Sequence, residues 1–177
     1  MIGRQKLQGS LTYTFVCRDK TGKLKWIQRK KNLVVDEGMN LQVNQFYLDQ
    51  AWYLGLIFDP GTGFDLEVTD SAAKITQVFP PNPPATNGWS EESKYSGRQL
   101  LSFTNETTSG GEGTAISDPV VLTYTGSSIF GGGFVVSAPA GNSGTLYSEI
   151  AGTSPKPVNG GDTITATVEF DIQRPPE

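Results

Sequence analysis

Three consecutive glycines, Gly131–Gly133, are the residues that most resemble a ligand loop, because glycine-rich loops can bring backbone amides close to a phosphate. Such a loop must open directly into a helix whose N-terminal amides bind the anion. The residues that follow are FVVSAP, which are β-branched and aromatic, and no Lys-Ser or Lys-Thr pair comes next. We therefore predict a β-strand with a bulge or tight crossing, where the missing side chains leave room for a bulky neighbour such as Trp89 or Tyr147.

Two groups of acidic residues could in principle bind a metal ion or act in catalysis. The first group is Asp59, Asp65, Glu67 and Asp70. Its oxygen ligands suit Ca²⁺, but its spacing differs from that of a helical calcium loop, and turns explain the glycines between its members. The second group is the adjacent pair Glu91–Glu92. Neighbours on an extended chain point to opposite faces, so these carboxylates cannot face each other across a sugar. We expect neither group to form a site.

The sequence contains no histidine, and Cys17 is its only cysteine. Ser-His-Asp and Cys-His catalysis, histidine general-base chemistry and the usual zinc sites are therefore excluded. Cys17 lies in the alternating run LTYTFVC, where we expect a small buried hydrophobic residue. The sequence shows neither a signal peptide nor a membrane-spanning run of about 18 apolar residues. We expect a non-enzymatic protein without cofactor or metal, folded in a reducing cytoplasm.

The chain is acidic overall, with a net charge of −4 and a pI of about 4.9. This balance argues against binding of nucleic acid through its phosphates. One basic stretch, residues 18–31, departs from it through Lys20, Lys23, Lys25, Arg29, Lys30 and Lys31. The stretch is either a partner- or anion-binding surface or the solvated edge of a hairpin, which is the commoner role of such charges. Arg29, Lys30 and Lys31 are our candidate contact residues here.

Aromatic residues could form a sugar-binding platform, which would draw on Trp26, Trp52 and Trp89 with Tyr53 and Tyr95. Such residues more often belong to the core, and Trp52, inside the apolar run AWYLGLIF, is predicted to be core. Trp89 follows a proline-rich segment and is the one tryptophan that we predict as a contact residue.

The first half of the chain predicts a hairpin, one helix and a buried strand. Residues 11–28 alternate apolar and polar around the turn DKTGK, as a β-hairpin does. Residues 36–48 carry an apolar stripe at helical spacing after Asp36, which can cap a helix of about three turns. The run AWYLGLIF predicts a buried strand in which Gly55 allows close approach of a neighbour, and DSAAKITQV predicts a short helical turn.

A proline-rich segment near residues 79–88 must be extended, because each proline fixes its own φ and biases the residue before it. We predict a projecting contact arm that includes Phe79, Pro80, Pro81, Pro83 and Pro84.

The second half is dominated by predicted strands separated by turn residues. In the last one, Ile164, Ala166, Val168 and Phe170 alternate with threonines and Glu169, which indicates one packed and one solvated face. Seven or eight such strands predict a mainly β protein, an antiparallel β-sandwich (jelly-roll-like) with one short α-helix near residues 36–48. We expect a single domain over residues 1–177 with short terminal extensions. We expect the final strand to offer a self-complementary edge and the chain to associate with itself as a dimer or trimer, with a monomer as the alternative.

Several motifs, in order, resemble a family of small structural proteins of tailed bacteriophages. They are KNLVVDEGMN (31–40), WYLGLI (52–57), GWSEESKYSG (88–97), GSSIFGGGFVVS, GNSGTLYS and NGGDTITATVEF, and together they span residues 31–170. The resemblance implies a virion component without catalytic residues. The chain departs from the pattern in its inserted FPPNPPAT and in its basic N-terminal hairpin.

The resemblance further implies a protein that decorates and cements the capsid by bridging major capsid subunits, on the outer surface of a particle assembled in the bacterial cytoplasm. Such a protein needs a stable β domain and arms that order on docking, for which the two termini and the proline-rich segment are natural bridges. The alternative is a tail or baseplate protein, or a receptor- or glycan-binding module that uses Trp89 and Tyr95.

Overall fold

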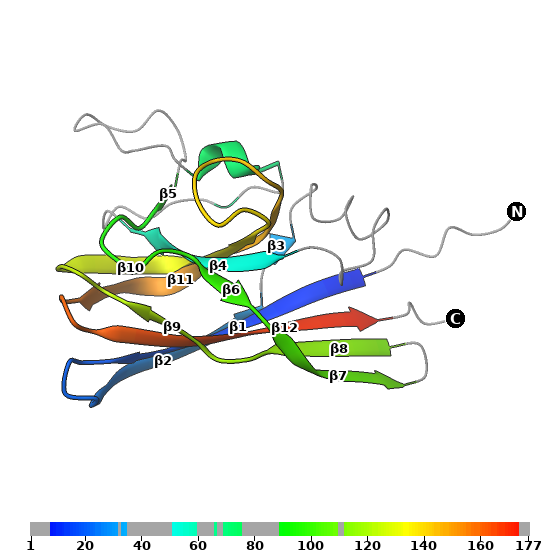
Figure 1. Ribbon diagram of the computed structural model, residues 1–177, viewed down its shortest axis with the longest axis horizontal. Coiled ribbons are helices and arrows are strands. Elements are labelled where there is room, and N and C mark those ends of the chain that lie inside the picture. Colours follow the sequence, from blue (N-terminus) through cyan, green and yellow to red (C-terminus); the bar gives the residue numbers. More distant parts are fainter. Residues whose placement is uncertain are drawn as a thin grey trace, which may run out of the picture.

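The computed structural model of the chain describes residues 8–31, 33–34, 51–59, 66, 69–75, 89–109 and 112–173. Within these ranges nearly all regular structure is β-strand (Figure 1). The elements are β1 (Gln8–Arg18), β2 (Leu24–Lys31), β3 (Leu33–Val34), β4 (Trp52–Phe58), the 3₁₀ turn η2 (Ala72–Lys74), β5 (Ser90–Glu91), β6 (Gln99–Leu101), β7 (Phe103–Ser109), β8 (Glu112–Ser117), β9 (Val120–Thr123), β10 (Ser128–Val136), β11 (Leu146–Val158) and β12 (Thr163–Gln173).

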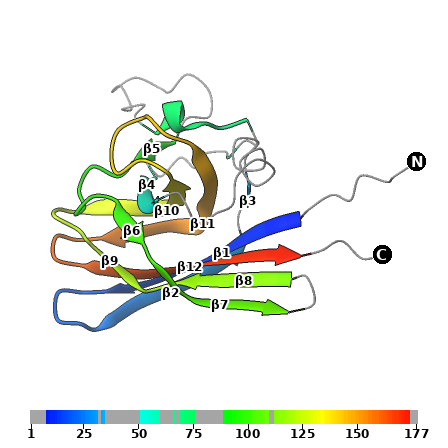
Figure 2. The same cartoon turned by 45° about the vertical axis from the view of Figure 1, so that its right-hand side comes forward.

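The strands form two antiparallel sheets of six strands each, which pack face to face as a β-sandwich (Figures 1 and 2). Sheet A has the order β2-β1-β12-β8-β7, and β9 pairs with β12 beyond the end of β8. Sheet B has the order β3-β11-β10-β4-β5, and β6 also pairs with β4. The predicted mainly β, antiparallel sandwich is confirmed.

Alternation along β1 and β12 places one face of sheet A in the core. Leu11, Tyr13, Phe15 and Cys17 are buried, and the residues between them are not. They pair across the ladder with Phe170, Val168, Ala166 and Ile164, which are also buried. The buried side chains of β1 and β12 therefore lie on the same face of sheet A. The packed face predicted for the last strand and the buried Cys17 are thus confirmed. Burial of each large side chain stabilises the fold by about 1.5–3 kcal/mol.

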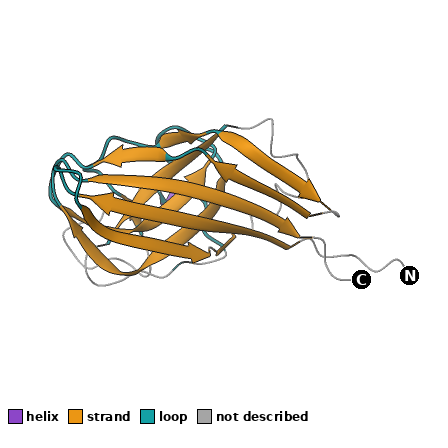
Figure 3. Ribbon diagram, turned by 90° about the horizontal axis from the view of Figure 1, so that it is seen from below, coloured by secondary structure: helices purple, strands orange, loops and turns teal. Residues whose placement is uncertain are grey.

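Sheet B is buried on both faces. Its inner face contributes Trp52 and Leu54 of β4 and Tyr147 of β11 to the main core, which confirms the predicted core position of Trp52. Its outer face carries a second apolar cluster, composed of Ile57, Ala72, Ile75, Trp89, Phe134, Val136 and Leu146. The segment around η2 covers this face, so the predicted helical turn is confirmed as a 3₁₀ turn. Sheet A has no second cluster of this kind among the described residues, and Figure 3 looks onto its outer face.

A buried hydrogen bond between the Tyr13 hydroxyl and Ser148 Oγ joins the two sheets through the core. Burial is the main reason why the pKa of Tyr13 lies far above its usual value. Because a buried hydroxyl without a partner would be destabilising, this pair favours one alignment of β1 against β11.

The predicted N-terminal hairpin is confirmed as β1 and β2. Its turn is closed by the Asp19 carboxylate, which accepts hydrogen bonds from the backbone amides of Thr21 and Lys23 and from the Thr21 hydroxyl. These bonds lower the pKa of Asp19. Gly22 adopts φ +85° there, a conformation that favours glycine.

Two predictions about elements have different outcomes. The predicted helix near residues 36–48 lies outside the described residues. The expectation that the final strand could be a self-pairing edge is wrong, because β12 is bonded to β1 on one side and to β8 and β9 on the other. The sequence of β12 shows a half-buried strand but not its place in the sheet. Among the described helices, none is long and apolar enough to cross a membrane.

Candidate partner-binding surface

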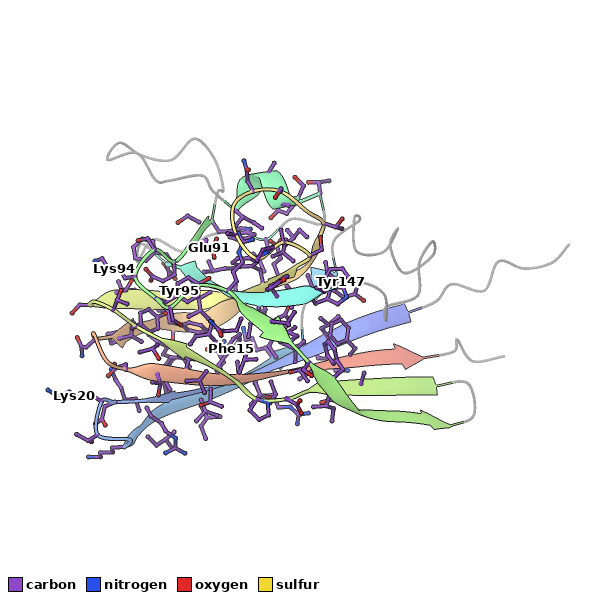
Figure 4. The ribbon with its side chains drawn as sticks, viewed as in Figure 1. Phe15, Lys20, Glu91, Lys94, Tyr95 and Tyr147 are labelled. Atoms are coloured by element: carbon purple, nitrogen blue, oxygen red, sulfur yellow. The ribbon has the colours of Figure 1, made fainter. Side chains whose placement is uncertain are left out.

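The glycine triplet is part of strand β10, as predicted. The ladders of β10 with β11 and β4 both shift register between Phe130 and Gly132, which marks a bulge. A Cβ atom on Gly132 would lie 1.9 Å from the Ile150 carbonyl oxygen, and one on Gly133 would lie 2.6 Å from Phe15 Cζ. The neighbour that fills the space over Gly133 is therefore Phe15, and the expectation of Trp89 or Tyr147 there is wrong. Figure 4 shows Phe15 between the two sheets.

Gly55 has a matching role on the opposite face of sheet B. A Cβ atom there would lie 2.3 Å from Phe134 Cζ, which confirms the predicted close approach. The glycines of β4 and β10 therefore let aromatic rings lie close against the sheet on either face.

The segment from Trp89 to Arg98 holds a group of ionisable side chains that are hydrogen-bonded to one another. The Arg98 guanidinium, whose side chain is only 1% exposed, donates from Nε to Glu91 Oε1 at 3.0 Å and from Nη2 to Glu91 Oε2 at 2.7 Å. It also donates to the carbonyl oxygens of Ala138 and Gly141 and lies over the Phe134 ring. The bidentate pair with Glu91 closes the segment on itself, and the bonds to the Ala138 and Gly141 carbonyls attach it to the β10–β11 connection.

Two tyrosines complete this cluster. Tyr95 donates its hydroxyl proton to Glu91 Oε1 at 2.5 Å. Burial, together with the negative charge of Glu91, raises the pKa of Tyr95 well above its usual value. Glu92 points to the other side, accepting hydrogen bonds from the Lys94 amide and from the Ser128 hydroxyl. Burial and Glu92 likewise raise the pKa of Tyr124. The Tyr124 hydroxyl has no hydrogen-bond partner among the described residues. Glu91, Glu92, Tyr95 and Arg98 are buried or half-buried and are bonded to one another or to neighbouring groups, so we interpret the cluster as a structural anchor.

The prediction that Trp89 is a surface contact residue is wrong. Trp89 is fully buried against Phe134, and its indole N–H donates to Asp70 Oδ2 at 3.2 Å. It therefore cannot form part of an exposed sugar platform, and Tyr95, bonded to Glu91, does not present its hydroxyl to one. The proline-rich segment near 79–88 lies outside the described residues, and with it lie Phe79, Pro80, Pro81, Pro83 and Pro84.

The remaining acidic residues do not converge. Asp59 and Asp70 are buried, while Asp65 and Glu67 lie outside the described residues. No group of three metal-ligating side chains occurs within the described ranges. The pair Glu91–Glu92 points in two directions, as predicted from its position on an extended chain.

The basic stretch forms one edge of sheet A. In the described part of the chain, β2 pairs with β1 alone and stands at the end of the sheet, at the lower boundary of the sandwich in Figure 1. Arg29 is exposed and donates to Glu169 Oε2 at 3.2 Å, Lys31 is exposed, and Lys30 is half-buried. Lys25 pairs with the buried Asp162. Lys20 projects from the turn in Figure 4.

Charge is unevenly distributed along the sequence. Residues 18–31 contain seven of the 14 Lys and Arg residues but one of the 18 Asp and Glu residues, so the stretch carries 7 − 1 = +6. The rest of the chain carries 7 − 17 = −10, which gives the overall −4. A surface with this asymmetry attracts anionic partners and repels a second copy of itself.

Sequence reasoning missed an apolar row beside the basic edge. Ile27 pairs with Val16, Val16 with Thr165, and Thr165 with Val121, so these side chains cross the outer face of sheet A. Ile27 is 61% exposed and Val121 is 52% exposed. The alternation of each strand could indicate such residues one by one, but the row depends on pairing between distant strands. The row and the edge residues Arg29 and Lys31 together form what we call the β2 surface.

Comparison with known proteins gives no further identification: no protein-family model, no curated protein and no solved structure matches the chain. The fold and the surface define an antiparallel β-sandwich with one basic, partly apolar edge.

Proposed function

We propose that this chain is a non-enzymatic structural protein of a tailed bacteriophage, which decorates the capsid and cements it by bridging major capsid subunits. The observation that carries the proposal is the segregation of charge along the chain: residues 18–31, which include the edge strand β2, carry +6 against −10 elsewhere. A protein that acts by binding alone needs such an exposed, chemically distinct surface on a stable scaffold.

The position of the family-like motifs in the fold supports the same proposal. WYLGLI lies in β4, GSSIFGGGFVVS covers β10, and NGGDTITATVEF covers most of β12. All three are interior strands of their sheets. The resemblance to phage structural proteins thus concerns the scaffold. The chain departs from the family pattern in its basic hairpin, and most of the basic side chains of this hairpin are exposed and free to suit its own partner.

The burial of Trp89 and the internal bonding of Tyr95 remove the exposed aromatic residues on which the glycan-binding alternative depended. A location in the tail or baseplate remains a different outcome of the experiment below.

The experiment compares particles of the phage that encodes the chain, made with and without it, for thermal breakage and for survival of osmotic shock. We expect particles that lack the chain to assemble but to break at lower temperature and under weaker shock, and the purified chain added back to restore both. Equal stability of the two kinds of particle, or a chain found only in tails, would contradict the proposal.

A further inference from the structure

We propose that the β2 surface binds an acidic, extended segment of the partner protein, which adds to sheet A as a further strand along β2. This inference rests on the proposed function, because it names the part of the shell protein that the chain would recognise. The binding site would consist of the unpaired backbone edge of β2 and the side chains of β2 on the outer and inner faces of sheet A.

The backbone of β2 is available for strand addition. It is an eight-residue strand, Leu24–Lys31, that pairs within the described ranges only with β1. An edge strand presents alternate N–H and C=O groups outward, which an extended segment can bond. The strand is long enough for several such bonds, unlike the two-residue strands β3 and β5 at the borders of sheet B.

The side chains of β2 specify the charge of the occupant. On the outer face, Ile27, Arg29 and Lys31 follow one another at alternate positions, and all three are exposed. In an added antiparallel strand, the residues opposite them would favour the order acidic, acidic, apolar. A second copy of the chain is a poor occupant, because pairing two β2 strands would set one +6 stretch against another.

The inner side of the same edge offers hydrogen-bonding groups that lack partners. Gln28 is only 6% exposed, and neither its amide nitrogen nor its amide oxygen has a partner among the described residues. The indole nitrogen of Trp26, two positions earlier, is also buried without a hydrogen-bond partner among the described residues. Short polar side chains on the inner side of an added strand would lie opposite these two residues and bond them, which removes a penalty that buried polar groups otherwise carry.

A protein segment fits this edge better than nucleic acid. Arg29 and Lys31 lie along a single strand, in line with the apolar Ile27, and the rest of the chain, at −10, repels a long polyanion. An extended acidic peptide can use the backbone, the cations and the apolar position together.

The test uses a synthetic peptide, acetyl-Glu-Thr-Glu-Thr-Val-Thr-amide, which places its acidic residues opposite Lys31 and Arg29 and its valine opposite Ile27. The control peptide has lysine in place of both glutamates. Binding to the isotopically labelled chain is followed by NMR shifts and by hydrogen exchange of backbone amides. We expect the acidic peptide to shift the β2 amides and to protect those on the open edge, and the lysine peptide to bind at least about tenfold more weakly.

Two matched variants separate the edge from general charge. Arg29→Gln/Lys31→Gln and Lys20→Gln/Lys23→Gln change the net charge equally, but the first pair lies on β2 and the second in the exposed turn. We expect the edge variant to lose about tenfold in affinity and the turn variant less than about twofold. Both should fold, since all four side chains are exposed.

Three results would overturn the inference: equal binding of both peptides, shifts that map away from β2, or binding of a duplex oligonucleotide when the acidic peptide fails. Dimerisation of the edge variant, with no peptide binding to the unchanged chain, would likewise show that the charges serve only to keep edges apart. Failure here leaves the particle-stability result unaffected, so the two proposals fail separately.

Discussion

Replacing Gly133 by alanine tests the interpretation of the glycine triplet as sheet architecture. The new methyl group would lie 2.6 Å from Phe15 Cζ, 3.2 Å from Phe15 Cε1 and 3.3 Å from the Gly55 carbonyl oxygen. Non-bonded carbon atoms pack at about 3.5–4.0 Å. The ring of Phe15 must therefore move by roughly 1 Å.

The surroundings of Phe15 oppose this movement. The ring is buried, with its centroid 5.1 Å from that of Phe130 and 5.9 Å from that of Tyr13. Overpacking of a well-packed core costs about 1–3 kcal/mol. In a domain of this size, about 1 kcal/mol changes Tm by about 2–4 °C, so we expect Gly133→Ala to lower Tm by roughly 2–12 °C.

Urea unfolding followed by tryptophan fluorescence measures the loss of free energy directly. Gly126→Ala is the control, because its nearest contact would be the flexible Lys94 side chain at 3.4 Å, and we expect a change within about 0.5 kcal/mol. Leucine is smaller than phenylalanine, so Phe15→Leu should relieve the clash with the new methyl group. Gly133→Ala should therefore lower the free energy of unfolding by less in the Phe15→Leu variant than in the wild type. A neutral Gly133→Ala, or strict additivity with Phe15→Leu, would refute the reasoning.

Two further predictions concern buried ionisable groups. Arg98→Met leaves Glu91 without its bidentate partner and should lower the free energy of unfolding by about 3–5 kcal/mol. Arg29→Met removes an exposed pair with Glu169 and should lower it by less than about 1 kcal/mol. Similar losses for the two variants in chemical denaturation would contradict this difference. Burial raises the pKa of the Cys17 thiol from 9.0 to about 11, so the folded chain holds this proton more tightly than the unfolded chain. The resulting stability is complete below about pH 9 and falls by about 2–3 kcal/mol as the pH rises to about 11. Urea titrations across this range should therefore show a steeper decline for the wild type than for Cys17→Ala, and equal slopes would disprove the assignment.

Local patterns predicted those features that depend on neighbours in sequence. Alternation located the buried faces of β1 and β12, and the glycine within AWYLGLIF indicated a close approach, because both signals reside in a few consecutive residues. The turn of the first hairpin is likewise local, since Asp19 bonds residues two and four positions away.

Features that depend on pairing between distant strands could not be predicted in the same way. The central place of β12 requires β1, β8 and β9, and the neighbour over Gly133 comes from β1, far away in the sequence. Trp89 was misplaced for the same reason. Its environment is set by Phe134 and Asp70, and a polar, proline-rich neighbourhood in sequence gives no information about them.

The most direct test of the account is an electron cryomicroscopy reconstruction of purified particles that contain the chain, combined with its copy number. The account predicts many copies of the sandwich on the outer capsid surface, each with the β2 surface against an acidic segment of the major capsid protein. Absence of the chain from the particle, or density confined to the tail, would contradict it.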